Sequence, residues 1–240
     1  EQYVGAAAGH VGGDGHGALL AGLGDDFRFL FVELGVQNHV GHAALFQKLG
    51  DVFALFYRNR ADQNRLSGFM QLDDLLDHGD LWLSETPDRV SRGWDGACNR
   101  TMTWVHLREK ATGKEFYYFN THLDHKGVVA RREGVKLVVR EVQQIAGRKA
   151  AVVVGGDLNS TIDDRIFDPL KKFMTPAREK APVTDRKGTY NGWGQAPNSM
   201  VIDHLFVRNM KCLSYRTLDG DYGVPYISDH YPIEIVVRLK

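Results

Sequence analysis

A carboxylate and a carboxamide stand two residues apart at Asp157 and Asn159, in the segment AAVVVGGDLNS. Residues 150–154 are small or β-branched and apolar, which predicts a short buried strand that ends at the glycine pair 155–156. In extended geometry the two polar side chains point to the same side of the chain. Their hard oxygen atoms suit Mg²⁺ and a phosphate group. Asp and Asn after glycines are also ordinary turn residues, so this segment alone leaves both interpretations open.

A second polar cluster, NTHLDH, follows a hairpin that we predict from strands at 101–107 and 115–120. It supplies Asn120, His122 and His125 just beyond the end of a strand, where α/β folds place active sites. The two histidines could bind a metal or phosphate, or be plain loop residues. The apolar stripe of residues 128–146 predicts a helix, from which Arg131 reaches phosphate if the helix begins near the site and faces solvent otherwise.

The C-terminal part offers an acid–base pair. Asp203 lies in the middle of a predicted buried strand at 200–207, where an unpaired carboxylate is costly. His230, in the segment ISDHYP, is the natural partner. An Asp–His pair fixes the imidazole tautomer and raises its basicity, as a general base for water requires. Asp229 beside it could be a carboxylate ligand of a metal, and a plain structural ion pair is the alternative.

The order strand, helix, strand over 115–154 predicts a crossover connection in an α/β chain. Further elements are predicted as strands at 27–32 and 233–239 and as helices at 38–59 and 161–173. The segment TYNGWG at 189–194 is predicted to be a turn with two aromatic residues.

The chain of 240 residues can bury a sizeable core, and its 30 basic and 30 acidic residues give a net charge of zero. This balance does not indicate a nonspecific nucleic-acid binder. The two cysteines have no metal-binding spacing, and the sequence leaves their pairing open. No stretch of about 18 apolar residues predicts a membrane span, and we expect a soluble monomer. No signal peptide is visible, while secretion or a periplasmic location after removal of a leader stays open.

Five motifs in this order, NTHLDH, GGDLNS, TYNGWG, IDHLFV and ISDHYP, resemble the endonuclease/exonuclease/phosphatase superfamily over about residues 71–240. That superfamily includes deoxyribonucleases, apurinic endonucleases, inositol-polyphosphate phosphatases and sphingomyelinases. The resemblance implies a four-layer α/β sandwich with two packed mixed β-sheets. It also implies metal-dependent hydrolysis of phosphate esters, by a phosphodiesterase or a phosphatase, through in-line attack of water on phosphorus.

The resemblance implies catalytic roles for five residues. His122 matches the histidine that contacts the scissile phosphate, and Asn159 matches an amide that contacts phosphate. Asp157 matches the residue that orients or deprotonates the attacking water. Asp203 and His230 match the Asp–His pair of the superfamily, in which the histidine acts as base or as an electrostatic clamp.

The resemblance also implies the metal and the substrate contacts. Asp229 matches the acidic residue near a bound Mg²⁺, which Mn²⁺ could replace. We predict further substrate contacts from Asn120, His125, Arg131 and Asn191. The partner is a phosphorylated small molecule, a lipid headgroup or a nucleic acid, and the balanced charge favours a small substrate.

The N-terminal part departs from the superfamily pattern. Members carry an early strand with an Asn and, about thirty residues later, a Gln-Glu pair whose Glu is a main metal ligand, and residues 1–69 show neither. Glu33 lies inside an apolar run, and the order around it differs. We therefore divide the chain into an atypical Gly/His-rich segment at 1–69, disordered or wrongly framed, and a phosphoesterase-like domain at 70–240. The alternatives to a working enzyme are an impaired remnant and a phosphate- or sugar-binding module.

Overall fold

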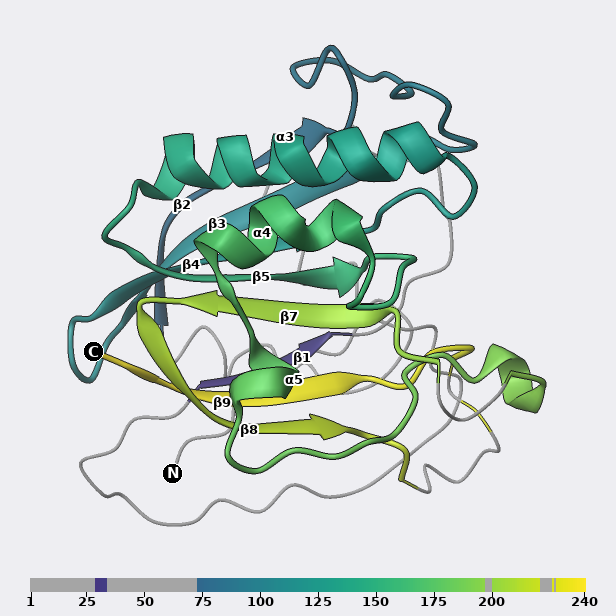
Figure 1. The fold of residues 1–240 in the computed structure, drawn as a ribbon. Coiled ribbons are helices and arrows are strands. Elements are labelled where there is room, and N and C mark those ends of the chain that lie inside the picture. Colours follow the sequence, from purple (N-terminus) through teal and green to yellow (C-terminus); the bar gives the residue numbers. More distant parts are fainter. Residues whose placement is uncertain (1–28, 34–72, 197–199, 221–225, 227) are drawn as a thin grey trace, which may run out of the picture.

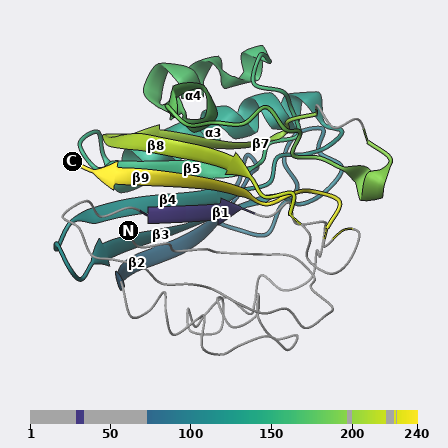
Figure 2. The same cartoon turned by 90° about the horizontal axis from the view of Figure 1, so that it is seen from below.

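The computed structural model describes residues 29–33, 73–196, 200–220, 226 and 228–240 (Figure 1). The larger of its two sheets has six strands, in the order β2 (Asp73–Trp82), β3 (Thr101–Glu109), β4 (Glu115–Thr121), β5 (Ala151–Asp157), β7 (Asp203–Arg208) and β6 (Thr175–Pro176). The smaller sheet has three strands, in the order β1 (Phe29–Glu33), β9 (Ile233–Leu239) and β8 (Met210–Thr217), which lie side by side in Figure 2.

Helices cover one face of the larger sheet. Figure 1 shows α3 (Val128–Ala146) and α4 (Asp168–Phe173) lying across it, with the short helix η2 (Arg165–Phe167) leading into α4. The four-residue helix α5 (Ala177–Lys180) contacts both β7 and β8, where the two sheets meet. No helix in these described parts of the chain is long and apolar enough to cross a membrane.

The central strands β5 and β7 of the larger sheet are buried on both faces, and their alternate residues therefore enter two different cores. On β5, Val153 packs into the core between the sheets, while Val152 and Val154 pack against the helices. On β7, Leu205 belongs to the core between the sheets and Phe206 to the helix side. The predicted α/β sandwich of two packed sheets is confirmed, and among the described residues it has one helical layer.

The strand directions explain the connections. Strands β4 and β5 run parallel, and α3 joins them as the predicted crossover. All other pairings in the larger sheet are antiparallel, so that sheet is mixed, while the described smaller sheet is antiparallel throughout.

Most predicted elements are present. The helix at 128–146 and the final strand at 233–239 have the predicted bounds, and the hairpin before NTHLDH is formed by β3 and β4. The strand predicted at 27–32 is described as β1, which begins and ends slightly later. The single helix predicted at 161–173 was wrong in its first part, because η2 and α4 begin only at Arg165. The helix predicted at 38–59 lies outside the described residues.

Candidate active site

The strand that carries Asp157 is longer than predicted. Instead of ending at the glycines, β5 continues through Gly155 and Gly156 to Asp157, which pairs with Asp203 at the start of β7. Gly156 has φ of 145°, a conformation that disfavours other residues. Asp203 is the first residue of β7, whereas the sequence predicted it in the middle of a strand.

This register puts two carboxylates directly opposite each other. Asp157 has the same strand parity as Val153, and Asp203 has that of Leu205, so both side chains belong to the face between the sheets. Like charges at directly opposite strand positions repel. Both carboxylates are also buried, so the site needs a cation between them.

His230 supplies that cation. Its Nδ1 lies 2.8 Å from Oδ2 of Asp203 and its Nε2 lies 3.7 Å from Oδ2 of Asp157. Burial opposes protonation of the imidazole, but the hydrogen bond and charge of Asp203, together with Asp157 and Asp229, outweigh it and raise the pKa of His230 to about 9. Burial also raises the pKa of Asp203, so this pair retains a proton at neutral pH.

His122 extends this chain of aspartate and histidine side chains to the surface. Its Nε2 lies 3.0 Å from Oδ2 of Asp157, and its side chain is 25% exposed. Burial alone would raise the pKa of Asp157, but the hydrogen bond and charge of His122 and the charge of His230 lower it. Asp157 is therefore an ionised acceptor between two histidines.

Asn159 joins this group in a conformation that the sequence did not predict. With φ of 48° it is not extended, and its backbone N–H donates to Oδ1 of Asp157 at 2.9 Å. The turn brings its amide nitrogen within 3.0 Å of Nε2 of His122, and the amide donates to the carbonyl of Leu123 at 2.9 Å. The five predicted catalytic residues thus lie in one cluster.

Asp229 and Asn191 hold the adjoining loops together. The carbonyl of Asp229 accepts hydrogen bonds from the N–H groups of Asn191 and Gly192 at 2.8 and 3.0 Å. The amide of Asn191 is itself bonded within the protein, since it donates to the carbonyl of Ser228 and accepts from the N–H of Trp193. These contacts describe a residue that fixes the loop, and contact of Asn191 with a substrate stays a prediction.

Thr189 and Tyr190, which the sequence did not single out, also contact this cluster. The hydroxyl of Thr189 accepts the backbone N–H of Asp203, and the ring of Tyr190 meets that of His230 edge-on at 5.0 Å between centroids. Their position in the TYNGWG motif was the available signal.

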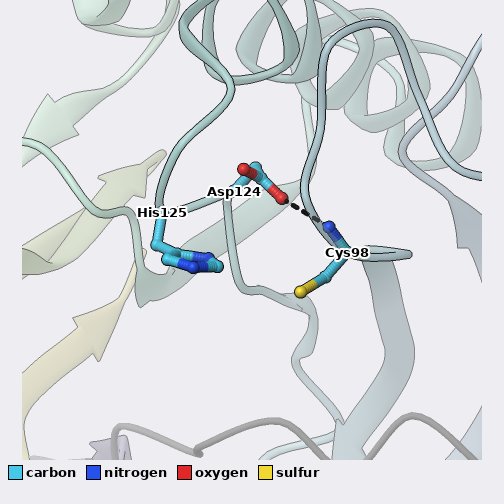
Figure 3. Close-up of side chains that lie close together, drawn as sticks. All are labelled: Cys98, Asp124 and His125. Atoms are coloured by element: carbon cyan, nitrogen blue, oxygen red, sulfur yellow. Dashed lines mark hydrogen bonds between the residues drawn. The ribbon is translucent and has the colours of Figure 1, made fainter.

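A second group of metal-ligand types lies in the loops before α3. Side-chain atoms of Cys98, Asp124 and His125 lie within 4.8 Å of one another (Figure 3). However, Asp124 accepts four backbone N–H groups, from Ala97 and Cys98 at Oδ2 and from the two residues before α3 at Oδ1. Burial opposes its ionisation, but these bonds prevail and hold the pKa of Asp124 well below its usual range.

Arg100 also occupies this group. Its Nε lies 3.6 Å from Oδ2 of Asp124, and its Nη2 lies 3.1 Å from Nδ1 of His125. Because arginine only donates, Nδ1 of His125 accepts and the ring proton lies on Nε2. A guanidinium at this position opposes a bound cation, so the Cys98–Asp124–His125 group joins loops rather than ligating a metal.

The remaining predicted residues lie around the same edge of the larger sheet. Asn120 is half-buried on β4 opposite Gly155, and Arg131 donates from Nη1 to the carbonyl of Asp124 at 2.9 Å. His125 is exposed. Glu33 ends β1 at the register position opposite Ile233, three residues after His230. Both cysteines are free.

The donor chemistry fits a divalent metal. The carboxylates of Asp157 and Asp203 lie with His230 in a group whose ligand-type atoms are within 4.8 Å of one another, and Asp229 directly precedes His230 in the sequence, so the oxygen donors of this group come from the aspartates. Carboxylate oxygens suit Mg²⁺, which needs only one or two of them when substrate phosphate is bound.

Comparisons with known proteins identify the family of this chain. A family model described as the endonuclease/exonuclease/phosphatase family matches residues 53–230, and therefore begins earlier than the predicted boundary near residue 71. A comparison with curated proteins gives no match.

Solved structures give further likenesses. An endonuclease/exonuclease/phosphatase from Bacteroides vulgatus is 32% identical with a TM-score of 0.66, covering 71% of this chain and 67% of its own. A mannosyl-6-phosphatase from Bacteroides thetaiotaomicron is 31% identical with a TM-score of 0.63, covering 70% and 67%. The human Nocturnin catalytic domain, at 13% identity, a TM-score of 0.57 and coverage of 89% and 81%, shares the fold. The chain belongs to the endonuclease/exonuclease/phosphatase family.

Proposed function

We propose that the protein hydrolyses a phosphate ester by in-line attack of a water molecule on phosphorus. The observation that carries this proposal is the continuous chain Asp203–His230–Asp157–His122, in which each imidazole lies between 2.8 and 3.7 Å from its neighbouring carboxylates. Such a chain can hold a cation beside a phosphate and accept a proton from water. Family membership, with phosphatases among the relatives, supports phosphate as the reacting group.

The protonation states suggest a division of roles. His230 is cationic at neutral pH, so we assign it to stabilising the negative charge that grows on phosphate oxygens. Asp157 is ionised and can orient the attacking water and take its proton. His122 and Asn159, at the exposed end of the chain, contact the phosphate.

We further propose Mg²⁺ as the cofactor, with Mn²⁺ as a substitute. Asp229, which precedes His230 in the sequence, is the proposed ligand. Glu33 is the proposed additional carboxylate, because Glu33 pairs with Ile233, three residues after His230. When bound, the ion polarises the phosphoryl oxygen and steadies the leaving oxygen.

The substrate is proposed to be a small phosphate ester, with His125 and Arg131 at its rim and Asn120 and Asn191 behind them. His125 presents its Nε2–H as a donor, because Arg100 donates to Nδ1. A remnant that binds phosphate without hydrolysis is the competing function, favoured by the missing N-terminal motifs.

Hydrolysis of bis-(p-nitrophenyl) phosphate and of p-nitrophenyl phosphate tests the proposal, with Mg²⁺ and then with EDTA. We expect metal-dependent turnover that falls about 100-fold or more in Asp157→Ala. Asp163→Ala is the matched control, since this exposed acid lies on the following loop. Absence of turnover from folded wild-type protein supports the remnant instead.

The role of Glu33 has its own test. The Mg²⁺ concentration for half-maximal turnover should rise about tenfold or more in Glu33→Gln, because the ion loses one of few carboxylates. An unchanged Mg²⁺ requirement would remove Glu33 from the proposal.

A further inference from the structure

The rim of the candidate site carries an exposed tryptophan. Trp193 is 54% exposed, although tryptophan is usually well buried. It lies in the short helix η3 (Gly192–Gly194), which Figure 1 places at the edge of the sandwich where β5 ends and β7 and β9 begin. This is the edge that holds the catalytic chain.

The backbone fixes Trp193 in a conformation that few residues adopt. Gly192, Trp193 and Gly194 have φ of 55°, 58° and 82° in succession. The N–H of Trp193 donates to Oδ1 of Asn191 at 2.8 Å, and the N–H of Gly194 donates to the carbonyl of Asn191 at 2.9 Å. Left-handed backbone at a non-glycine residue persists where the surroundings determine it, and it is common at ligand-binding positions.

Two tyrosine side chains pack closely against the glycines of this turn. A side chain added at Gly194 would meet the hydroxyl of Tyr226 at 2.5 Å, and one added at Gly192 would meet that of Tyr190 at 3.2 Å. The two glycines are thus packed against tyrosines on either side of Trp193. The indole is presented outward by a turn that is itself well packed.

The same turn is hydrogen-bonded to residues 229–231, the segment that carries His230. The N–H groups of Asn191 and Gly192 donate to the carbonyl of Asp229, and the N–H of Tyr231 donates to the carbonyl of Thr189 at 2.7 Å. Tyr190 and His230 form a bridge between the two segments. The position of Trp193 is therefore set relative to His230.

We infer that Trp193 is a specificity residue that stacks on a ring in the alcohol part of the substrate. The inference rests on the proposed phosphate-ester hydrolysis and names its substrate class: phosphate esters whose alcohol carries a ring with an apolar face. A sugar ring and a nucleobase both offer such a face, and indole binds such faces by stacking. The balanced charge of the chain favours a single small ester of this kind.

The test compares kcat/KM for three phosphate esters in the full-length protein with Mg²⁺. Hexose 6-phosphate and a nucleoside 5′-monophosphate carry rings, and glycerol 3-phosphate does not. Trp193→Asn removes the indole and keeps a residue that tolerates left-handed backbone, so the turn survives. Trp193→Phe keeps a smaller ring, and Val90→Asn, at a residue that is 67% exposed in another loop, is the matched control.

We expect the ratio of kcat/KM for the ring ester to that for glycerol 3-phosphate to fall about tenfold in Trp193→Asn and to recover largely in Trp193→Phe. A fall for hexose 6-phosphate identifies the stacked ring as a sugar, and a fall for the nucleoside 5′-monophosphate identifies it as a nucleobase. An unchanged ratio, or an equal fall in Val90→Asn, overturns the inference.

A binding measurement separates this inference from the proposed hydrolysis. If the wild-type protein hydrolyses none of the esters, the proposed function fails, and quenching of tryptophan fluorescence by each ester still reports on Trp193. Quenching by a ring ester that disappears in Trp193→Phe supports the stacking site. Equal quenching in both proteins overturns it.

Discussion

Two groups of aspartate and histidine lie at the same edge of the larger sheet and differ in what their oxygen atoms face. In the Asp203–His230–Asp157 chain, carboxylate oxygens meet imidazole nitrogens, and the protons between them can move. In the Cys98–Asp124–His125 group, the carboxylate meets four backbone N–H groups and a guanidinium, none of which titrates near neutral pH.

The difference shows that residue type alone does not decide what a group of aspartate and histidine can do. Asp124 fixes the loop of Ala97 and Cys98 to the start of α3, a helix whose N-cap residue, Gly127, offers no side chain for capping. Its charge is used in holding the backbone. Asp157 is held by its strand and so keeps an oxygen for two histidines.

Replacing one histidine from each group gives the largest expected contrast. His230→Ala should lower kcat on p-nitrophenyl phosphate by about 100-fold or more, because the charge between two buried carboxylates is lost. His125→Ala should cost about tenfold or less, since that imidazole donates one hydrogen bond at the rim. Equal losses in the two variants would break the comparison.

A third histidine, His204, extends the comparison of the two groups. His204 is buried and its Nε2 lies 2.8 Å from the carbonyl of Ser160, and burial lowers its pKa from 6.5 to about 4. The unfolded chain therefore takes up this proton first, and the free energy of unfolding should decrease by on the order of 3 kcal/mol as pH falls from 6.5 to 4.

Urea denaturation across this pH range measures that dependence. His204→Gln can still donate to Ser160 and does not titrate, so its stability should change less over the same interval. If the free energy of unfolding of the wild-type protein falls with decreasing pH no more steeply than that of the variant, His204 is protonated in the folded protein.

Asp124→Asn should act on stability more than on chemistry. The amide retains one acceptor oxygen where four N–H groups converge, so we expect a loss of about 2 kcal/mol in the free energy of unfolding. Thermal denaturation measures it, with kcat on p-nitrophenyl phosphate as the second readout. A fall in kcat as large as that of His230→Ala, in folded protein, would place Asp124 in the chemistry.

The smallest effect is expected at Cys98. Cys98→Ser should change neither the midpoint of thermal denaturation nor the shift of that midpoint caused by Zn²⁺, because Arg100 stands where a cation would have to lie. A Zn²⁺-dependent rise in the wild-type midpoint that vanishes in the variant would reveal a metal site in the second group.

The sequence predicted those features that depend on local pattern. Helix α3 followed from its apolar stripe and from Gly147, which ends it with φ of 65°. The Asp203–His230 pair followed from the cost of a buried charge. Strand β2 was missed because acidic residues interrupt its apolar alternation, and its place at the edge of the sheet tolerates them.

Features that depend on distant partners could not be predicted. The extension of β5 to Asp157 follows from pairing with β7, and the left-handed conformation of Asn159 follows from contacts with Asp157 and Leu123. The role of Asp124 as a joint between loops depends on residues 26 and 27 positions away.

The pairing of Asp157 with Asp203 has a consequence for how such an enzyme could change over evolutionary time. The main-chain pairing of β5 with β7 fixes the register that places the two carboxylates opposite each other. The turn with Trp193 lies outside both strands and is hydrogen-bonded to the segment of Asp229 and His230. On the roles proposed above, substitutions, insertions or exchanges in that turn would alter which ester is accepted while Asp157 and Asp203 keep their spacing, so new substrate preferences would arise without changes to the two strands.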